Sequence, residues 1–338
     1  MKVFFESYNE VFQNETGGIR IKIEQIKSHL SNCHEIKYFD KWNDKISECD
    51  ILHLFMPNIQ NYGLFRLAQS QGKKIIISSV ATPESNIKII YRNVADRIMR
   101  NKGIYYYSKY MYSNADRIIA ETVYEREFLI KCYKLEPSKV VVIPNGITIS
   151  SKSIPNDYFS SRTGIKGKFV LQVGRFDRNK NQLSTIKAMN NIGYPLVLIG
   201  GPDKDDSSYY ELCRKTANKN IHFLGWVDHD DPLLYAAYNE CHTFILPSHH
   251  EILGNALLEA AAMGANIVST NVLPLKDWGV DELCLSVNPK DEKEIELKLR
   301  ESLGTEKNDR VQQIINEKFS WSRVVKDHLN VYESVAEA

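Results

Sequence analysis

The sequence predicts an α/β protein made of two doubly wound parallel sheets. Short apolar runs rich in Val and Ile alternate with stretches of helical periodicity, which is typical of strands and helices that follow one another in a parallel sheet. The alternation stops in a segment rich in Ser and Gly, residues 147–168, and then resumes. A chain of 338 residues is long enough for two domains of ordinary size.

Five strands are expected in the first half of the chain, each bounded by polar residues. A helix is expected over residues 17–30, where Ile19, Ile23, Ile26 and Leu30 recur at helical spacing. The strands are KVFF (2–5), DILHLF (50–55), KKIIISSV (73–80), RIIAE (117–121) and KVVVIP (139–144).

The second half repeats the alternation after the interruption. Helical stretches are expected at 181–192 and 231–241, and an amphipathic helix at the end of the chain, FSWSRVVKDHLNVYESV (319–335). The expected strands are KFVLQVG (168–174), PLVLIGG (195–201), IHFLG (221–225), HTFILP (242–247) and NIVST (266–270). The predicted divisions are a first domain over 1–150, a linker over 151–166 and a second domain over 167–319.

Composition excludes several classes of protein. The net charge is +1, from 43 Lys and Arg against 42 Asp and Glu, so the chain as a whole is not a polyanion binder. No apolar run approaches the ~18 residues of a membrane span, and MKVFFESYNE turns acidic too early for a secretory signal. Free thiols in a reducing cytosol are expected for the six scattered cysteines, Cys33, Cys49, Cys132, Cys213, Cys241 and Cys284.

Two loops carry groups suited to phosphate. Gly17 and Gly18 follow the first strand and open the first helix, whose N-terminal amides favour an anion. Arg175 and Lys180 follow the first strand of the second half and suit a diphosphate. The alternatives are an ordinary strand–helix turn for the glycines and a solvated basic turn, with Arg178 and Asp177, for the cations.

The segment HHEILGNALLEAAAMGANIVST (249–270) places the carboxylate of Glu259 in a run of Leu, Ala and Gly. We expect Glu251 in the loop after the strand 242–247, and a helix that starts near Leu253 or Gly254 and ends at Gly264. The positions three and four residues from Glu259 hold no cation. Both carboxylates are therefore expected to await the hydroxyl groups of a ligand rather than a structural cation, the alternative being a Lys or Arg from elsewhere in the fold.

These motifs, taken in order, resemble retaining glycosyltransferases of family 4, which have the GT-B fold of two Rossmann-like domains facing a central cleft. Glu251 and Glu259 resemble the E-x7-E signature of the family, with Gly254 inside it. The other matching segments are Gly17-Gly18, NADRIIAETVYEREFL (114–129), VVIPNGI (141–147), VGRFDRNKN (173–181), HFLGWV (222–227) and the terminal helix.

The resemblance implies a role for each matching residue. Arg175 and Lys180 would neutralise the donor diphosphate, and Glu259 would accept hydrogen bonds from the ribose. Glu251 would contact the donor sugar. Gly17 and Gly18 would line the phosphate side from the first domain. The amides that follow Glu251, at Leu253, Gly254 and Asn255, would lie near sugar and phosphate. The terminal helix, 320–338, would pack back on the first domain. No metal or cofactor is expected, because the cations and a helix N-terminus would stabilise the negative charge of the diphosphate.

The sequence departs from the family pattern on the acceptor side. Many relatives carry a His after the fourth strand of the first domain, where this chain has ISSVATPES (77–85). Thr82 and Glu84 are the polar candidates there. Lys276 stands where an acid often stands in the loop TNVLPLKDW (270–278). The group that activates the acceptor is therefore not indicated.

Residues 84–112 form a basic, tyrosine-rich stretch. Six cations (Lys88, Arg92, Arg97, Arg100, Lys102 and Lys109) stand against Glu84 and Asp96, a local charge of +4, and the tyrosines are Tyr91, Tyr105, Tyr106, Tyr107, Tyr110 and Tyr112. A basic amphipathic helix with Tyr suits an anionic membrane surface. The alternative is an ordinary helix that packs its Ile face on the sheet. No nucleic-acid motif is present.

The function predicted from these observations is retaining, metal-independent hexosyl transfer from a UDP- or GDP-sugar. The resemblance implies a glycan acceptor on a polyprenyl-type lipid carrier, in the biosynthesis of a bacterial surface polysaccharide such as O-antigen or capsule. A cytoplasmic enzyme, peripheral at the inner face of the membrane, is expected. A nucleotide-sugar epimerase or hydrolase of the same fold, and a non-catalytic nucleotide-sugar or membrane-binding module, are the alternatives.

Overall fold

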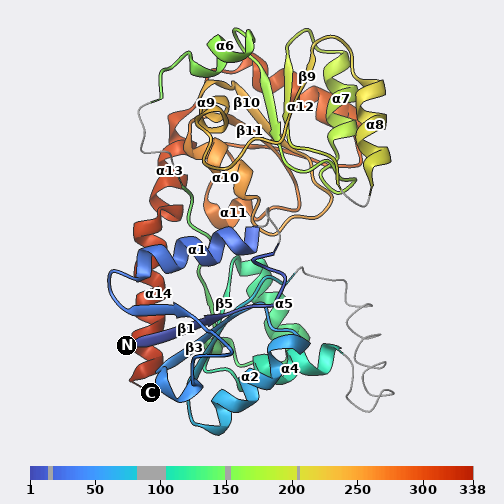
Figure 1. Ribbon diagram of the computed structural model, residues 1–338. Helices are drawn as coiled ribbons and strands as arrows, with labels where there is room; N and C mark the ends of the chain where they lie inside the picture. Colours follow the sequence, from blue (N-terminus) through green and yellow to red (C-terminus); the bar gives the residue numbers. More distant parts are fainter. Residues whose placement is uncertain (14–17, 82–103, 149–153, 204–205, 338) are drawn as a thin grey trace. The chain divides into compact units, whose positions relative to one another are not determined.

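The computed structural model describes residues 1–13, 18–81, 104–148, 154–203 and 206–337. The chain divides into two compact units, one of residues 1–146 and 321–338 and the other of residues 147–320 (Figure 1). Each unit contains a six-stranded sheet whose paired strands all run parallel.

The first unit has the strand order β2-β1-β3-β4-β5-β6. Its strands are β1 (Lys2–Glu6), β2 (Glu35–Tyr38), β3 (Ile51–Phe55), β4 (Lys74–Ser78), β5 (Arg117–Ala120) and β6 (Val140–Val142). Its helices are α1 (Gly18–Leu30), α2 (Ile59–Ser70), α4 (Ile104–Asn114), α5 (Val123–Tyr133) and α14 (Trp321–Ala336), with the short 3-10 turns η1 (Ile46–Glu48) and η2 (Pro137–Lys139).

Alternating side chains of the first sheet form two apolar layers. Phe4, Leu52 and Leu54 face α2, α4 and α5, whereas Val3, Ile51 and Ile76 face α1 and α14 (Figure 1). This alternation follows from the two-residue period of a strand that is buried on both faces. The terminal helix α14 thus completes the α1 side of the sheet.

The second unit has the strand order β12-β11-β10-β7-β8-β9. Its strands are β7 (Val170–Val173), β8 (Leu196–Ile199), β9 (Ile221–Gly225), β10 (Thr243–Leu246), β11 (Asn266–Thr270) and β12 (Leu285–Val287). Its helices are α6 (Tyr158–Thr163), α7 (Gln182–Asn190), α8 (Ser207–Thr216), α9 (Pro232–Glu240), α10 (Asn255–Ala262), α11 (Leu275–Trp278), α12 (Glu292–Gly304) and α13 (Asp309–Phe319).

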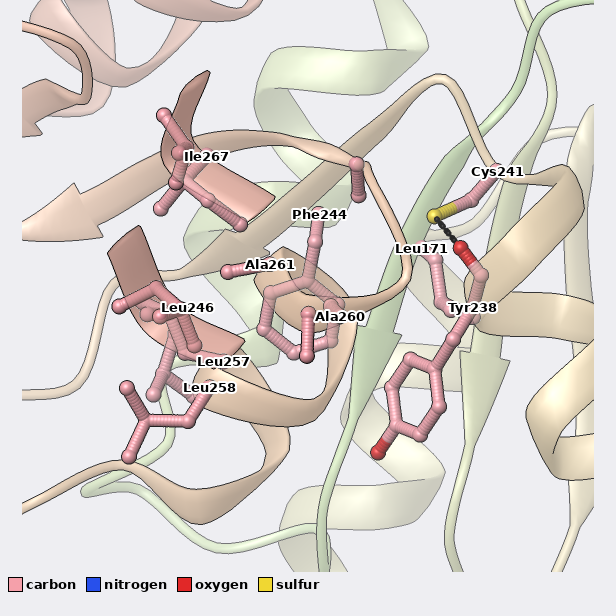
Figure 2. Close-up of a cluster of buried hydrophobic side chains, with 14 of the residues drawn as sticks. Leu171, Tyr238, Cys241, Phe244, Leu246, Leu257, Leu258, Ala260, Ala261 and Ile267 are labelled. Atoms are coloured by element: carbon pink, nitrogen blue, oxygen red, sulfur yellow. Dashed lines mark hydrogen bonds between the residues drawn. The ribbon is translucent and has the colours of Figure 1, made fainter. Parts of the chain in front are cut away.

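Two apolar layers also enclose the second sheet. Helices α7, α8 and α12 cover one face, and α6, α9, α10, α11 and α13 cover the other. Figure 2 shows the second layer, where Leu257, Leu258 and Ala261 of α10 pack near Phe244 and Leu246 of β10. The predicted α/β architecture of two doubly wound, Rossmann-like sheets is confirmed, and all ten predicted strands are present.

Three features differ from the sequence-based expectation. Strands β2 and β12 were not predicted. The segment expected to be a linker contains helix α6, and its Phe159 is fully buried against the second sheet. The terminal helical stretch is divided at Ser320, between α13 and α14, and the two helices belong to different units.

Candidate functional site

The predicted donor-binding residues of the second unit gather at the point where its strand order reverses. The chain runs outward from β7 through β8 to β9 and then returns to β10 on the other side of β7. The loops after β7 and β10 therefore leave the sheet side by side. In an open α/β sheet, ligands bind outside the carboxyl ends of the strands at such a switch point.

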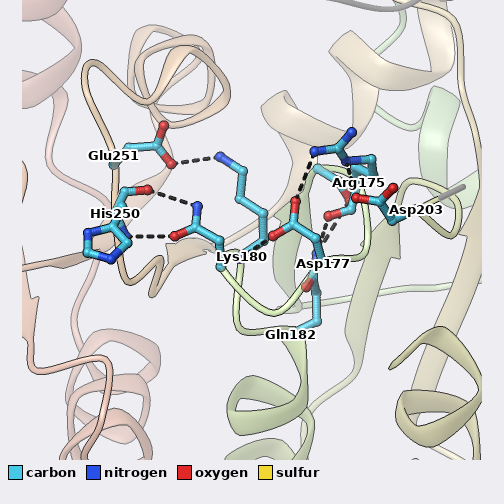
Figure 3. Close-up of polar contacts among 9 residues, drawn as sticks. Arg175, Asp177, Lys180, Gln182, Asp203, His250 and Glu251 are labelled. Carbon is cyan, nitrogen blue, oxygen red and sulfur yellow. Dashed lines mark hydrogen bonds and ion pairs between the residues drawn. The ribbon is translucent and has the colours of Figure 1, made fainter. Parts of the chain in front are cut away.

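Lys180 and Glu251 connect these two loops. The Nζ atom of Lys180 lies 2.7 Å from Oε2 of Glu251 (Figure 3), and the two side chains are 26% and 14% exposed. Glu251 lies in the loop after β10, as predicted. The expectation that it lacks a structural cation is wrong, because the loop after β7 brings Lys180 to it.

Asn179 holds the same two loops together through the backbone. Its Oδ1 accepts from the amide of His250 at 2.8 Å and its Nδ2 donates to the carbonyl of His250 at 2.9 Å. Its carbonyl accepts from the amide of His249 at 2.8 Å. These bonds fix the backbone immediately before Glu251, so its carboxylate is positioned before any ligand arrives.

Arg175 contacts different carboxylates from Lys180. Its Nε lies 3.2 Å from Asp203 and its Nη2 lies 3.5 Å from Asp177 (Figure 3). The Arg175 side chain is 56% exposed, and such exposed pairs contribute little to stability. The guanidinium is therefore able to exchange these carboxylates for an incoming anion. Asp177 also accepts from the amide of Lys180 at 2.9 Å, which fixes the turn between the two cations.

Helix α10 begins and ends where the sequence predicted. Gly254 is its N-cap, with φ of 69° and no side-chain cap, and Gly264 follows its end with φ of 87°. A Cβ at Gly254 would contact Leu246 at 3.2 Å and Leu273 at 3.3 Å. A larger residue at Gly254 would therefore be strained and crowded, and the first-turn amides of α10 lack a side-chain cap.

Glu259 has partners inside the second unit. The hydroxyl of Tyr238 in α9 donates to Oε2 at 2.9 Å, and Nε2 of His229 lies 3.1 Å from Oε1. The hydrogen bond to Glu259 raises the pKa of His229 above its usual range, although burial opposes the shift. The expected absence of a partner is therefore wrong. The partners are a tyrosine and a histidine, not the Lys or Arg that the alternative named.

The loop after β8 lies close to the loop after β7. A Cβ at Gly200 would overlap the carbonyl of Gly174, and a Cβ at Gly201 would overlap the indole of Trp226. Trp226 follows β9 and is 54% exposed. The two glycines thus permit the close packing of these loops and the placement of an exposed indole beside the site.

Several of these residues were not identified from the sequence, namely Asn179, Asp203, His229 and Tyr238. Only Tyr238 had a local signal: with Tyr235 it recurs at helical spacing in DPLLYAAYNEC, but that spacing predicts burial rather than a partner for Glu259. The other three lie in loops whose proximity is set by the fold.

Two families of known proteins match the chain, one in each half. The family described as Glycosyltransferase Family 4 matches residues 1–151, and the family described as Glycosyl transferases group 1 matches residues 154–318. The chain belongs to the group 1/family 4 type of GT-B glycosyltransferases.

Three bacterial relatives are named for a cps region, an O-antigen chain and a capsular polysaccharide. A 41.2 kDa protein in the cps region of Klebsiella pneumoniae is 24% identical over 96% of this chain and 95% of its own length. The O-antigen chain mannosyltransferase B of Escherichia coli is 28% identical over 49% of this chain and 45% of its own length. The capsular polysaccharide biosynthesis glycosyltransferase CapM of Staphylococcus aureus is 26% identical over 68% and 66%.

Solved structures of other proteins share the fold. Sucrose-phosphate synthase from Thermosynechococcus elongatus has a TM-score of 0.77 at 16% identity and covers 99% of each chain. The Anabaena protein HepE in complex with UDP has a TM-score of 0.76 at 15% identity and covers 99% of this chain and 100% of its own. At these identities the similarity shows the GT-B fold alone.

The first unit of this glycosyltransferase contributes fewer described site residues. Gly18 is the first residue of α1, whereas Gly17, Thr82 and Glu84 lie outside the described residues. Of the basic stretch, residues 84–103 also lie outside them, and Ile104–Asn114 form α4. Tyr105 and Tyr112 of α4 are buried in the core of the first sheet, so these two rings do not face a membrane surface.

The described residues contain no metal-binding cluster, disulfide or membrane-spanning helix. Among the described residues, no group of three or more His, Cys, Asp or Glu side chains is arranged to hold a metal ion. All six cysteines are free. No helix within the described part of the chain is long and apolar enough to cross a membrane.

Proposed function

We propose that this glycosyltransferase transfers a hexose-type sugar from a UDP- or GDP-sugar to a glycan acceptor, with retention of configuration. The observation that carries the proposal is the Lys180–Glu251 pair, 2.7 Å apart at the β7/β10 switch point, next to the first turn of α10. A cation, a carboxylate and free amides at one sheet edge suit a ligand that joins a diphosphate to a sugar. HepE, a structural neighbour, binds UDP.

Arg175 and Lys180 would neutralise the diphosphate of the donor. Arg175 is 56% exposed and pairs with Asp177 and Asp203 at 3.5 and 3.2 Å, and Lys180 is anchored by the hydrogen bond from its backbone amide to Asp177. As the nucleoside diphosphate departs, both cations would stabilise the charge that develops on it. The amides of Leu253, Gly254 and Asn255 would add donors, and Gly17 and Gly18 would line the phosphate side. We therefore propose that no metal ion takes part.

Glu259 would accept hydrogen bonds from the ribose while it keeps its protein partners. An ionised carboxylate offers about four acceptor positions. Tyr238 and His229 occupy one position on each oxygen. The carboxylate side chain is 13% exposed, which leaves an open side for ribose hydroxyls. On this proposal, Tyr238 and His229 orient Glu259 for the nucleotide.

Glu251 would contact the donor sugar. Lys180 holds its carboxylate, and Asn179 fixes the backbone before it. No residue at the site is proposed as a covalent nucleophile; the acceptor hydroxyl would attack on the face from which the diphosphate departs. Thr82 and Glu84 remain the proposed acceptor-side residues.

We propose that the acceptor is a lipid-linked glycan in bacterial surface-polysaccharide biosynthesis and that the enzyme binds it at the cytoplasmic face of the membrane. A relative in Campylobacter jejuni, 25% identical over 63% of this chain and 56% of its own length, is named for a diphospho-undecaprenol acceptor. The basic stretch 84–112 would provide the peripheral membrane contact, through its cations and the tyrosines outside the core.

A donor screen tests the proposed activity. Thermal shift with UDP-, GDP-, ADP- and CMP-sugars identifies the nucleotide that stabilises the protein, and turnover is then measured with and without a lipid-linked acceptor. Transfer that requires the acceptor supports the proposal. Turnover without an acceptor would favour an epimerase or hydrolase, and binding without any product would favour a non-catalytic module.

Vesicle sedimentation tests the membrane contact separately. The protein is expected to sediment with anionic vesicles and to be released by salt, because the attraction is screened. A variant with Lys88, Arg92 and Arg97 changed to Glu is expected to stay in the supernatant. Equal partitioning to neutral and anionic vesicles, or a wild-type result from the variant, would count against the contact.

A further inference from the structure

A pocket in the first unit lies at the carboxyl ends of β1 and β2, beside the chain that leads from β1 toward α1. Its volume is about 270 Å³, just below the ~300–1,000 Å³ of pockets that hold drug-sized ligands. A space of this size admits one small ring. It is lined by Phe5, Glu6, Ser7, Tyr8, Asn9, Val11, Phe12, Gln13, Ile23, Tyr38 and Phe39.

Aromatic side chains form much of the wall. Phe12 and Tyr38 are each 37% exposed, and their ring centroids lie 5.1 Å apart in an edge-to-face arrangement. Phe39 packs on buried Phe4 with ring centroids 5.6 Å apart, which holds that side of the pocket. Exposed aromatic faces of this kind bind flat apolar surfaces, such as the C–H face of a sugar ring.

Glu6 supplies a carboxylate to the pocket. It is the last residue of β1 and is partly buried. Burial raises the pKa of Glu6 to about 7, although the charge of Lys41 opposes the shift. A partly buried carboxylate that lines a pocket is able to accept hydrogen bonds from a ligand.

The backbone around the pocket is held in place. Ser7 Oγ donates to the carbonyl of Phe55 at 3.0 Å, and the amide of Asn9 donates to Gln60 at 2.8 Å. The amide of Phe39 donates to the carbonyl of Phe5 at 2.9 Å, which ties the two strand ends together. Pre-organised walls of this kind reduce the ordering cost of binding.

We propose that this pocket binds one pyranose ring, with the Glu6 carboxylate accepting hydrogen bonds from ring hydroxyls and Phe12 and Tyr38 covering an apolar face of the ring. A ring hydroxyl can donate a hydrogen bond to the Glu6 carboxylate. A cationic ligand fits less well, because Lys41 already places a positive charge near Glu6 and donates to Asn9 at the rim at 2.5 Å. The ring could come from the acceptor glycan or from the donor sugar. Its assignment to either rests on the proposed function, whereas the pocket itself does not.

Binding should depend on pH through Glu6. The ionised carboxylate is the better acceptor, and with a pKa of about 7 its ionised fraction rises from ~0.1 at pH 6 to ~0.9 at pH 8. Because apparent affinity scales with the competent fraction, wild type is expected to bind several-fold more tightly at pH 8 than at pH 6. The other titratable groups that line the pocket or act on Glu6 among the described residues are Lys41, Tyr8 and Tyr38.

Saturation-transfer difference NMR with methyl glucopyranoside, methyl mannopyranoside and methyl N-acetylgalactosaminide tests the proposal on the full chain. Glu6→Gln should weaken binding at pH 8 several-fold and abolish the pH dependence. Phe12→Ala should remove most of the signal. Matched controls are Glu35→Gln, whose side chain is 64% exposed, and Trp42→Ala, which is 94% exposed; neither residue lines the pocket. Both controls should bind like wild type.

Comparing methyl glycosides with nucleotide-sugars identifies the source of the ring, and the measured quantity is binding rather than turnover. Signals from the methyl glycosides that depend on Glu6 assign the pocket to a glycan, whereas Glu6-dependent signals seen only on the sugar of a nucleotide-sugar assign it to the donor. No signal from any pyranoside, signals unchanged in both Glu6→Gln and Phe12→Ala, or binding of tetramethylammonium alone would overturn the proposal. If the protein binds sugar through Glu6 but has no transferase activity, the pocket proposal holds and the proposed function is wrong.

Discussion

The hydroxyl of Tyr238 donates to Oε2 of Glu259 across 2.9 Å, while His229 approaches the other oxygen at 3.1 Å. The glutamate that the sequence left without a partner is therefore held between α9 and the loop before it. This arrangement gives Glu259 two roles that experiments can separate, one in stability and one in nucleotide binding.

The stability role should depend on pH. Glu259 raises the folded-state pKa of His229 above its usual 6.5, so this interaction stabilises the fold below that value and is lost as pH rises through the higher folded-state pKa. Glu259→Gln is therefore expected to lower the melting temperature more at pH 5.5 than at pH 8.5. Melting curves of the variant and wild type at both pH values check this. An equal loss at both would mean that the His229 contact contributes nothing.

The binding role should distinguish the two glutamates. Glu259→Gln is expected to weaken binding of the bare nucleoside diphosphate, because the charge that strengthens hydrogen bonds to hydroxyls is lost. Glu251→Gln should leave that binding nearly intact and lower turnover of the full donor. Isothermal titration and turnover assays measure the two effects. If Glu259→Gln melts lower yet binds nucleotide normally, Glu259 is a structural partner of Tyr238 and His229 only.

The diphosphate clamp can be tested with a neighbouring arginine as control. Removing the side chain of Arg175 or Lys180 should weaken nucleoside diphosphate binding by ~1.5–3 kcal/mol, the contribution of a hydrogen bond to a charged group. Arg178→Ala is the matched control, because Arg178 is 66% exposed and pairs with Asp206 at 2.9 Å. Titration of the free nucleotide compares the three variants. Unchanged affinity in both Arg175→Ala and Lys180→Ala would exclude the clamp.

A buried ion pair should dominate the stability of the first unit's α1 side. Lys22 Nζ lies 2.8 Å from Glu121 Oε1, with side chains only 2% and 7% exposed. Lys22→Met should cost ~3–5 kcal/mol, because it leaves the glutamate buried and unpaired, and adding Glu121→Leu should recover much of that loss. Urea unfolding measures both.

The exposed pair on the same helix supplies the control for that experiment. Arg20 and Glu24 lie 2.8 Å apart with side chains 35% and 42% exposed. Arg20→Met should change stability by no more than ~1 kcal/mol. A similar loss from Lys22→Met and Arg20→Met would contradict the assigned cost of the buried pair.

The sequence by itself determined the strands of the sheet interiors and the local form of the site. Ile75, Ile76 and Ile77 are buried on both faces of the first sheet, and such a strand shows as an unbroken apolar run. The edge strands β2 and β12 were not predicted because they lack such an apolar run. In β2 only Ile36 is buried, so no apolar run or regular alternation marks it. The bounds of α10 were predictable because Gly254 and Gly264 determine the backbone conformation at their own positions, which is a local effect.

Only the tertiary structure decided which groups face the site carboxylates. Lys180 and Glu251 are 71 residues apart in the chain, and Tyr238 and Glu259 are 21 apart. Helical periodicity relates residues three or four positions apart, so neither pairing was visible in it. The reversal of strand order between β7 and β10 brings the first pair together, and the packing of α9 beside α10 brings the second. Burial of Tyr105 and Tyr112 was decided in the same way, because the face that α4 turns to the sheet depends on how the helix packs.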